Sequence, residues 1–326
     1  MAPRLWYMNA DCEMELAAPG GRYRRPASFD RVNRRLAAHL LWLAAPGDAL
    51  LLEEGEAESL RARAERRGVE LVTTASQGEQ RGRTFTPWGW TPSAIARGAA
   101  TGAAVRPISP EIVARVNSKL FSHALERELG IALPGARAAR TFEELAEAVA
   151  RGCPKSEDKW VIKSPFGFAA RERVLGRGPL LEGPQATWAR RRLILGETLI
   201  FQPWLEVRRE YGVVMDVLAQ GGIRIHGISD LQTNGAGTPT GYLLGRKVAP
   251  ERARELERVA AVVGERLFRE GYTGPAGLDA LEHAGGLHPL LEINARYTMG
   301  FVALAVERQL RPAEPVFWSS REQETD

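Results

Sequence analysis

Two carboxylates and one amide near the C-terminal end of the chain have the types and spacing of a cation site. They are Asp279, Glu292 and Asn294, in a stretch that reads GLDALEHAGGLHPLLEINAR from Gly277. Apolar runs on both sides of Gly285-Gly286 predict two short strands joined by a tight turn. Glu292 and Asn294 then share a strand face, which Asp279 can reach from the neighbouring strand. Such oxygen ligands suit Mg²⁺, although a hairpin with ordinary solvent-facing polar residues fits the same pattern.

The bulk composition is that of an ordinary globular chain. Its 326 residues are 44% hydrophobic and 26% charged, enough for a large core divided between two or three lobes. No apolar run approaches the roughly 18 residues of a membrane helix, and polar residues after Met8 argue against a signal peptide. The two cysteines, Cys12 and Cys153, are far apart and predict no disulfide framework. We therefore expect a cytoplasmic protein with no membrane partner.

The charge pattern gives no indication of a nucleic-acid partner. The net charge is +4 and the pI is near 9.2, but basic and acidic residues alternate, as they do over residues 61–67. This pattern is typical of a solvated helix face. Nearly all of the cations are arginines, and lysine occurs only at positions 119, 155, 159, 163 and 247. Each lysine is therefore a candidate for a specific role.

The order of apolar periodicities predicts an α/β protein with an α+β core. Strands over 5–8, 49–52 and 69–73 alternate with helices over 29–43 and 56–67, which favours a parallel sheet with crossover helices. We further expect helices over 109–128, 141–151, 184–195, 251–270 and 300–309, strands over 160–164 and 199–205, and a hairpin over 211–229. Residues 84–92 and 234–241 are expected to be loops, and everything after Pro312 a loose tail.

Four segments in order carry a resemblance to a known family. They are a helix with Asn117-Ser-Lys119, a strand ending in Lys163, the segment Gln202-Pro-Trp204-Leu205, and the hairpin from Asp279 to Arg296. Over residues 105–312 this order and spacing resembles the ATP-grasp superfamily, which includes D-alanine–D-alanine ligase, biotin carboxylase and glutathione synthetase. The most specific feature is a glutamate 13 positions after the aspartate, within Glu-x-Asn-x-Arg.

The resemblance implies an ATP-grasp fold with an N-terminal pre-ATP-grasp parallel-sheet domain over residues 1–107. The two ATP-grasp subdomains would span residues 108–198, with the lysines and phosphate loop, and 199–312, with the metal site. Residues 313–326 would be a flexible tail. Motifs around Asn9, Asp11, Trp88 and Trp90 resemble those of uncharacterised bacterial ATP-grasp proteins, and they could line a ligand crevice or form a structural loop.

The resemblance also assigns roles residue by residue. Lys119 and Lys163 match the lysines that hold the ATP phosphates. The adenine-binding segment is matched by Gln202, Trp204 and Leu205, and the ribose-binding carboxylate is matched by Glu210. Asp279, Glu292 and Asn294 match the ligands of Mg²⁺, which Mn²⁺ could replace, and Arg296 matches a residue facing phosphate or an acyl phosphate. Other readings of the same residues are a helix-surface cation for Lys119, a core side chain for Trp204 and a surface salt bridge for Arg296.

Two departures from the family pattern bear on the substrate. The loop after Lys163 has a single glycine, Gly167, but adds Arg171, which could clamp a phosphate through two N–H groups. Gly277 stands where D-alanine ligases have an arginine, so the resemblance does not extend to D-alanine as the substrate.

The resemblance implies an ATP-dependent carboxylate–amine ligase that passes through an acyl phosphate, with a thiol or hydroxyl as a less frequent acceptor. Its partners would be small-molecule or peptide acids and amines, with Arg246 and Arg296 as candidate acid-binding residues, and a homodimer is allowed. A kinase acting on a small molecule, or an inactive ATP-binding protein, would share the same motifs.

Overall fold

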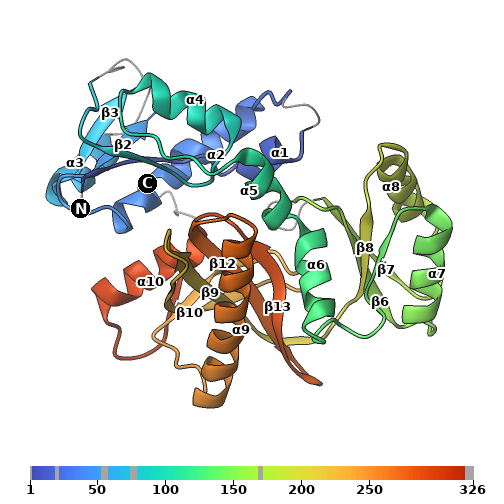
Figure 1. The fold of residues 1–326 in the computed structure, drawn as a ribbon. Helices are drawn as coiled ribbons and strands as arrows, with labels where there is room; N and C mark the ends of the chain where they lie inside the picture. The colour runs from blue at the N-terminus through green and yellow to red at the C-terminus, as the bar shows by residue number, and fades with distance from the viewer. Residues whose placement is uncertain (1, 19–21, 53–57, 74–78, 168–171, 320–326) are drawn as a thin grey trace.

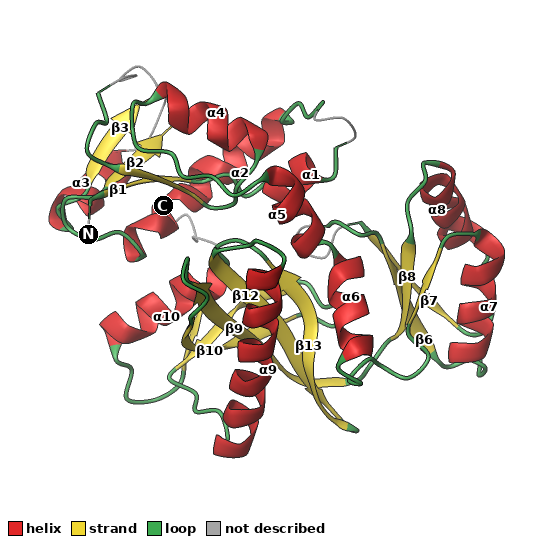
Figure 2. Cartoon of the chain, in the orientation of Figure 1, coloured by secondary structure: helices red, strands yellow, loops and turns green. Residues whose placement is uncertain are grey.

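The structure is a computed structural model that describes residues 2–18, 22–52, 58–73, 79–167 and 172–319. Within these ranges the strands form three sheets, each covered by helices (Figures 1 and 2). The N-terminal sheet lies above the C-terminal sheet in Figure 1, and the middle sheet lies to one side of both. None of the described helices is both long and apolar enough to cross a membrane.

The N-terminal unit contains a four-stranded parallel sheet, which confirms the predicted parallel arrangement. Its order is β3-β2-β1-β4, with β1 Arg4–Tyr7, β2 Ala49–Leu52, β3 Glu70–Thr73 and β4 Thr84–Pro87. The helical segments are α1 Cys12–Leu16, α2 Ala27–Ala37, η2 Ala38–Trp42, α3 Glu58–Arg66 and α4 Pro92–Ala100. The prediction of a loop from residue 84 was wrong for β4, which pairs with β1 and buries Phe85.

The middle unit is a four-stranded antiparallel sheet in the order β5-β8-β6-β7. Its strands are β5 Arg137–Ala139, β6 Lys159–Lys163, β7 Arg173–Arg177 and β8 Leu199–Pro203. Helices α7 Phe142–Gly152 and α8 Gly183–Ile194 pack against it. Because β8 pairs with β5 and β6, this unit extends to Pro203, one strand beyond the predicted boundary at residue 198.

The C-terminal unit is a six-stranded antiparallel sheet in the order β13-β12-β9-β10-β11-β14. Its strands are β9 Val207–Val217, β10 Ile223–Thr233, β11 Pro239–Leu244, β12 Gly274–His283, β13 Gly286–Asn294 and β14 Val316–Trp318. Helix α9 Pro250–Arg269 packs in one core cluster with this sheet, and α10 Met299–Leu310 lies in the cluster shared with the N-terminal unit.

Two segments of the C-terminal unit differ from the prediction. Residues 316–318 form β14, which pairs with β11, so a loose tail after Pro312 was wrong for these residues. The loop expected over 234–241 ends earlier, because β11 begins at Pro239.

The helix expected over residues 109–128 is broken into α5 Pro110–Asn117 and α6 Lys119–Glu128. Ser118 between them has an extended backbone (φ −73°, ψ 135°), and its hydroxyl accepts a hydrogen bond from the Leu120 amide. Lys119 is therefore the first residue of a helix, where the helix dipole favours anions. The Asn117 side chain fixes the break by accepting a hydrogen bond from the Ala295 amide at 2.7 Å.

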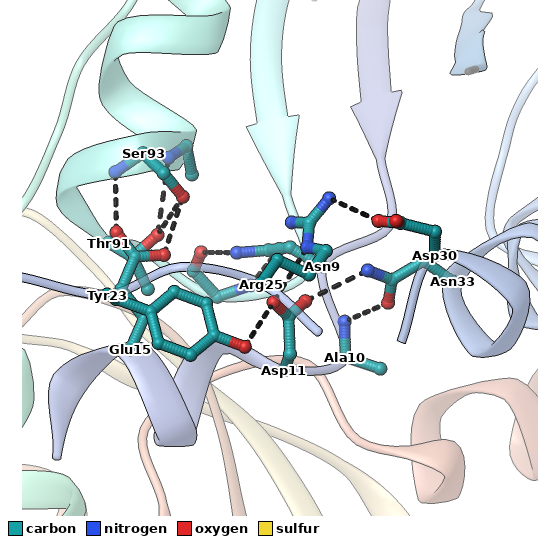
Figure 3. Close-up of polar contacts among 12 residues, drawn as sticks. Asn9, Ala10, Asp11, Glu15, Tyr23, Arg25, Asp30, Asn33, Thr91 and Ser93 are labelled. Carbon is teal, nitrogen blue, oxygen red and sulfur yellow. Dashed lines mark hydrogen bonds and ion pairs between the residues drawn. The ribbon is translucent and has the colours of Figure 1, made fainter. Parts of the chain in front are cut away.

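Asp11 ties α1 to the rest of the N-terminal unit (Figure 3). Its buried carboxylate accepts hydrogen bonds from Tyr23 Oη at 2.9 Å, Arg25 Nε at 2.7 Å and Asn33 Nδ2 at 2.9 Å. Arg25 also lies 3.8 Å from Asp30 on α2. The network joins three segments that are apart in the sequence, which supports the structural reading of this motif.

The neighbouring polar residues have similar roles. The Asn9 amide donates to the Gly89 carbonyl at 2.8 Å and accepts from the Gly89 N–H at 3.1 Å. The Glu15 carboxylate accepts from the backbone and the hydroxyl of Ser93 at 2.7 and 2.5 Å. A Cβ at Gly89 would lie 2.7 Å from Cys12 Sγ, so this close approach requires glycine.

Replacement of Asp11 should destabilise the protein more than replacement of an exposed cap. Asp11→Ala leaves buried donors of Tyr23 and Asn33 without their acceptor, so we expect a loss of about 3 kcal/mol or more in the free energy of unfolding. Thr141→Ala removes the capping box of α7 and should cost about 1 kcal/mol. Urea denaturation followed by tryptophan fluorescence measures both values, and equal losses would contradict the structural role of Asp11.

Candidate functional site

The β12–β13 hairpin brings the three predicted cation ligands together. Asp279 lies directly opposite Glu292 in the register, and Asn294 lies opposite Gly277 on the same pair of strands. Asn294 Nδ2 donates a hydrogen bond to Asp279 Oδ2 at 3.2 Å. The hairpin therefore holds two carboxylates and an amide at one place, as its alternation predicted.

The two carboxylates of the site lie side by side and repel each other. Burial, with a further contribution from the Glu292 carboxylate, raises the pKa of Asp279 to about 7, although Arg296 opposes this shift. A bound cation would offset the repulsion between the two ionised carboxylates. All three side chains offer the hard oxygen ligands that Mg²⁺ prefers. Among the described residues, this hairpin included, no three His, Cys, Asp or Glu side chains are grouped to hold a metal, so the candidate site has two carboxylates and one amide.

The two predicted phosphate-binding lysines lie beside these carboxylates. Lys119 Nζ is 2.7 Å from Glu292 Oε1 and donates to the Gly167 carbonyl at 3.3 Å. Burial alone would lower the pKa of Lys119, but Glu292 and Glu13 hold it above its ordinary value. Burial lowers the pKa of Lys163 to about 8. The Glu292 carboxylate opposes this shift, and the positive charge of Lys119 adds to it.

A cavity of about 850 Å³ opens between the middle and C-terminal units, with walls from β6, β8, β9 and β10. This volume lies in the range of small-molecule and cofactor sites, roughly 300–1,000 Å³. Its lining includes the predicted site residues Lys163, Gln202, Trp204, Leu205, Glu210 and Arg246. The structure thus brings the predicted nucleotide-binding residues to one cavity, except for Lys119, which does not line it.

Individual side chains give this cavity both polar and aromatic walls. The Glu210 carboxylate accepts a hydrogen bond from Thr233 Oγ1 at 2.6 Å, and burial raises its pKa. Gln202 is buried in β8. Trp204 faces the cavity, and the Arg173 guanidinium lies 5.6 Å from the centroid of its ring, so the reading of Trp204 as a core side chain is not supported.

Arg173 is a cavity residue that the sequence analysis missed. It begins β7, lines the cavity and donates to the Ala236 carbonyl. Burial lowers the pKa of Arg173, and the carboxylates of Glu292 and Glu210 oppose this shift. Arg171, which we predicted to clamp a phosphate, lies outside the described residues. The excess of arginine after Lys163 was the only signal for Arg173 in the sequence.

The structure does not place the two candidate acid-binding arginines alike. Arg246 lies on the nucleotide-sized cavity, with Nη1 3.7 Å from the Asp230 carboxylate. Arg296 is instead held by Glu13 of α1, with Nε 2.8 Å from Glu13 Oε1. A direct role for either arginine in binding an acid stays a prediction.

Comparison with protein-family models and with curated protein sequences finds no match for this sequence. Solved structures do match the whole arrangement. N5-carboxyaminoimidazole ribonucleotide synthetase from Thermus thermophilus matches with a TM-score of 0.53 and 17% identity, over 85% of this chain and 75% of that chain. Biotin carboxylase from Campylobacter jejuni, in a beta-gamma-ATP complex, matches with a TM-score of 0.58 and 11% identity, over 85% of this chain and 65% of that chain.

A third match is the biotin carboxylase domain of 2-oxoglutarate carboxylase from Hydrogenobacter thermophilus, solved with MgADP, ADP and bicarbonate. Its TM-score is 0.58 at 12% identity, over 87% of this chain and 68% of that chain. The chain has the ATP-grasp fold. This confirms the fold predicted from the sequence.

The charge of Asp279 should make the unliganded ATP-grasp core less stable at high pH. An unfolded aspartate loses its proton near pH 3.9, whereas folded Asp279 retains it to about pH 7. The folded state therefore binds more protons between these values, and stability falls as the pH rises. Asp279→Asn, which stays neutral, should gain stability relative to the wild type over this window.

Thermal unfolding in a chelator, at about pH 5 and pH 8, measures this effect. Asp279→Asn should raise the midpoint above that of the wild type mainly at the higher pH. The exposed Glu143→Gln on α7 is a matched control and should show no such dependence. A midpoint difference independent of pH would contradict the assigned burial of Asp279.

Proposed function

We propose that the protein is an ATP-dependent ligase that activates a carboxylate as an acyl phosphate and joins it to an amine. The observation that carries this proposal is the contact of Lys119 with Glu292. It places an ammonium group, of the kind that binds phosphates, against a pair of carboxylates beside the cavity. The ATP-grasp fold supports it, because similar structures include a synthetase solved with ADP, a biotin carboxylase in a beta-gamma-ATP complex and a biotin carboxylase domain solved with MgADP.

In this proposal the cavity binds ATP with its adenine toward the middle unit. Gln202 and the backbone of Trp204 and Leu205 would contact the base, and Glu210 would accept hydrogen bonds from the ribose. Lys163 lines the cavity, and Lys119 contacts Glu292, which follows the cavity residue Leu291 in β13; in this proposal the two ammonium groups would hold the phosphates. A lysine ammonium is a compact charge suited to this role.

The cation site fits the same picture. Asp279, Glu292 and Asn294 would hold Mg²⁺, or Mn²⁺ in its place, and the ion would neutralise charge on the transferred phosphate. The chain contributes position and charge: the lysines hold the phosphates, and the low-dielectric surroundings of the buried Asp279 strengthen each interaction.

The proposed chemistry has two steps. A carboxylate oxygen of the acid attacks the γ-phosphorus, the bond to the β-phosphate oxygen breaks, and ADP leaves. The amine then attacks the acyl carbon, its proton is released to solvent or phosphate, and inorganic phosphate departs as the amide forms. Neither step needs a nucleophilic side chain, which agrees with positioning as the main contribution in phosphoryl transfer.

Loss of a cavity lysine should weaken nucleotide binding. Lys163→Ala removes a charged hydrogen bond worth about 1.5–3 kcal/mol, so we expect roughly 10- to 100-fold weaker ATP binding by calorimetry. Lys155→Ala is the control, because Lys155 is exposed and outside the cavity lining. Equal losses in the two variants would mean that a general positive field, and not this site, binds ATP.

A screen of amino acids, other small acids and short peptides for ADP release tests the reaction itself. A ligase gives ADP, free phosphate and a joined product in equal amounts, whereas a kinase leaves the phosphate on a stable product. Glu292→Ala should abolish ADP release while the protein stays folded. Wild-type turnover in that variant would exclude the hairpin as the metal site, and no joined product with any acid and amine would argue against a ligase.

A further inference from the structure

A carboxylate of the N-terminal unit reaches the candidate cation site. Glu13 lies on α1, and its side chain and that of Arg296 are 2% and 12% exposed. Arg296 Nε donates to Glu13 Oε1 at 2.8 Å, and Nη2 bonds to the same oxygen. Burial alone would raise the pKa of Glu13, but Arg296 and Lys119 hold it below its usual range. This ion pair therefore persists between two units far apart in sequence.

The contacts of Arg296 leave it little capacity for a ligand. Its Nη2 also donates to Asn294 Oδ1 at 2.8 Å, and its Nη1 donates to the Tyr297 carbonyl at 3.1 Å. A guanidinium has five N–H groups, and contacts with the described residues engage four of them. Arg296 held in this way keeps one N–H group for a ligand, and a substrate carboxylate bound through two N–H groups would have to displace one of these contacts.

The same contacts fix the orientation of Asn294. A guanidinium only donates hydrogen bonds, so it must face the carbonyl oxygen of the amide. The Nδ2 group then points to Asp279 Oδ2, at 3.2 Å. A flipped amide would put N–H groups against the N–H groups of Arg296, so the arginine selects one of the two amide orientations.

We infer that Glu13 is a positioning residue: it fixes Arg296, which in turn holds Asn294 Oδ1 through one lone pair and leaves the second lone pair of that oxygen for a cation. The importance of this series of contacts for the reaction rests on the proposed function, in which Asn294 and Asp279 hold the cation. Groups that orient ligand side chains from outside commonly change metal affinity by about 10- to 100-fold when they are removed. Glu13 would thus link the N-terminal unit to the ATP-grasp core.

The test uses the full chain and a matched control on the same helix. Glu13→Gln removes the charge but keeps the shape, and Glu15→Gln makes the same change at a buried carboxylate that contacts Ser93 instead. The readout in the unliganded protein is the NMR signal of the Asn294 side-chain amide, which is assigned by its absence in Asn294→Ala. This signal should shift in Glu13→Gln and stay in place in Glu15→Gln. Arg296→Lys, which lacks the planar fork, should shift it as Glu13→Gln does.

Binding of Mn²⁺ in the presence of ADP, followed by electron paramagnetic resonance, gives the functional readout. We expect about 10-fold weaker Mn²⁺ binding in Glu13→Gln, little change in Glu15→Gln, and no further loss when Glu13→Gln is added to Arg296→Ala. Additive losses, or tighter binding in Glu13→Gln because a freed Arg296 serves the ligand directly, would overturn the inference.

The two readouts separate this inference from the proposed function. If the wild type binds neither ADP nor Mn²⁺, the proposed function fails, but the amide signal still decides whether Glu13 positions Asn294. If the amide signal is unchanged in Glu13→Gln, the positioning role is wrong even where ADP and Mn²⁺ bind normally.

Discussion

The repulsion between two carboxylates is the constraint around which the candidate site is arranged. Strand register puts Asp279 against Glu292, and the half-burial of Asp279 reduces the water that would otherwise screen its charge. Such a pair is tolerated only where cations or protons offset it. The structure meets this demand with Lys119 on Glu292 and with Arg296 close to Asp279.

The offsetting cations come from separate parts of the chain, so the site depends on the packing of all three units. Lys119 begins a helix that packs on β13, and Lys163 ends a strand of the middle sheet. Arg296 follows the hairpin but is held by Glu13 of the N-terminal unit. A displacement of any unit would therefore change the electrostatic balance at the carboxylates, whatever ligand the site accepts.

The sequence predicted those features that local pattern determines. Alternation and the Gly-Gly turn predicted the hairpin and the shared position of Asp279 and Glu292, and family-like spacing predicted the fold. Features that depend on distant partners were missed. The break at Ser118 rests on the contact of Asn117 with Ala295, and β14 forms because β11 offers a free edge. Arg173 and Glu13 carry no local signal, since their positions are set by sheets that pair far along the chain.

The different states of Lys119 and Arg296 indicate which of them can respond to an entering phosphate. An ammonium has three N–H donors, and within the described residues Lys119 uses them on Glu292 and Gly167, which leaves one. Its place at a helix N-terminus adds the positive end of the helix dipole, which favours an anion. Arg296 has four of its five N–H groups in use and a buried carboxylate as its partner. A phosphate can thus bind Lys119 without first breaking the contact with Glu292, whereas a ligand that takes two N–H groups of Arg296 would have to displace one of its present contacts. The lysine is suited to contact the ligand, and the arginine to hold the residues that do.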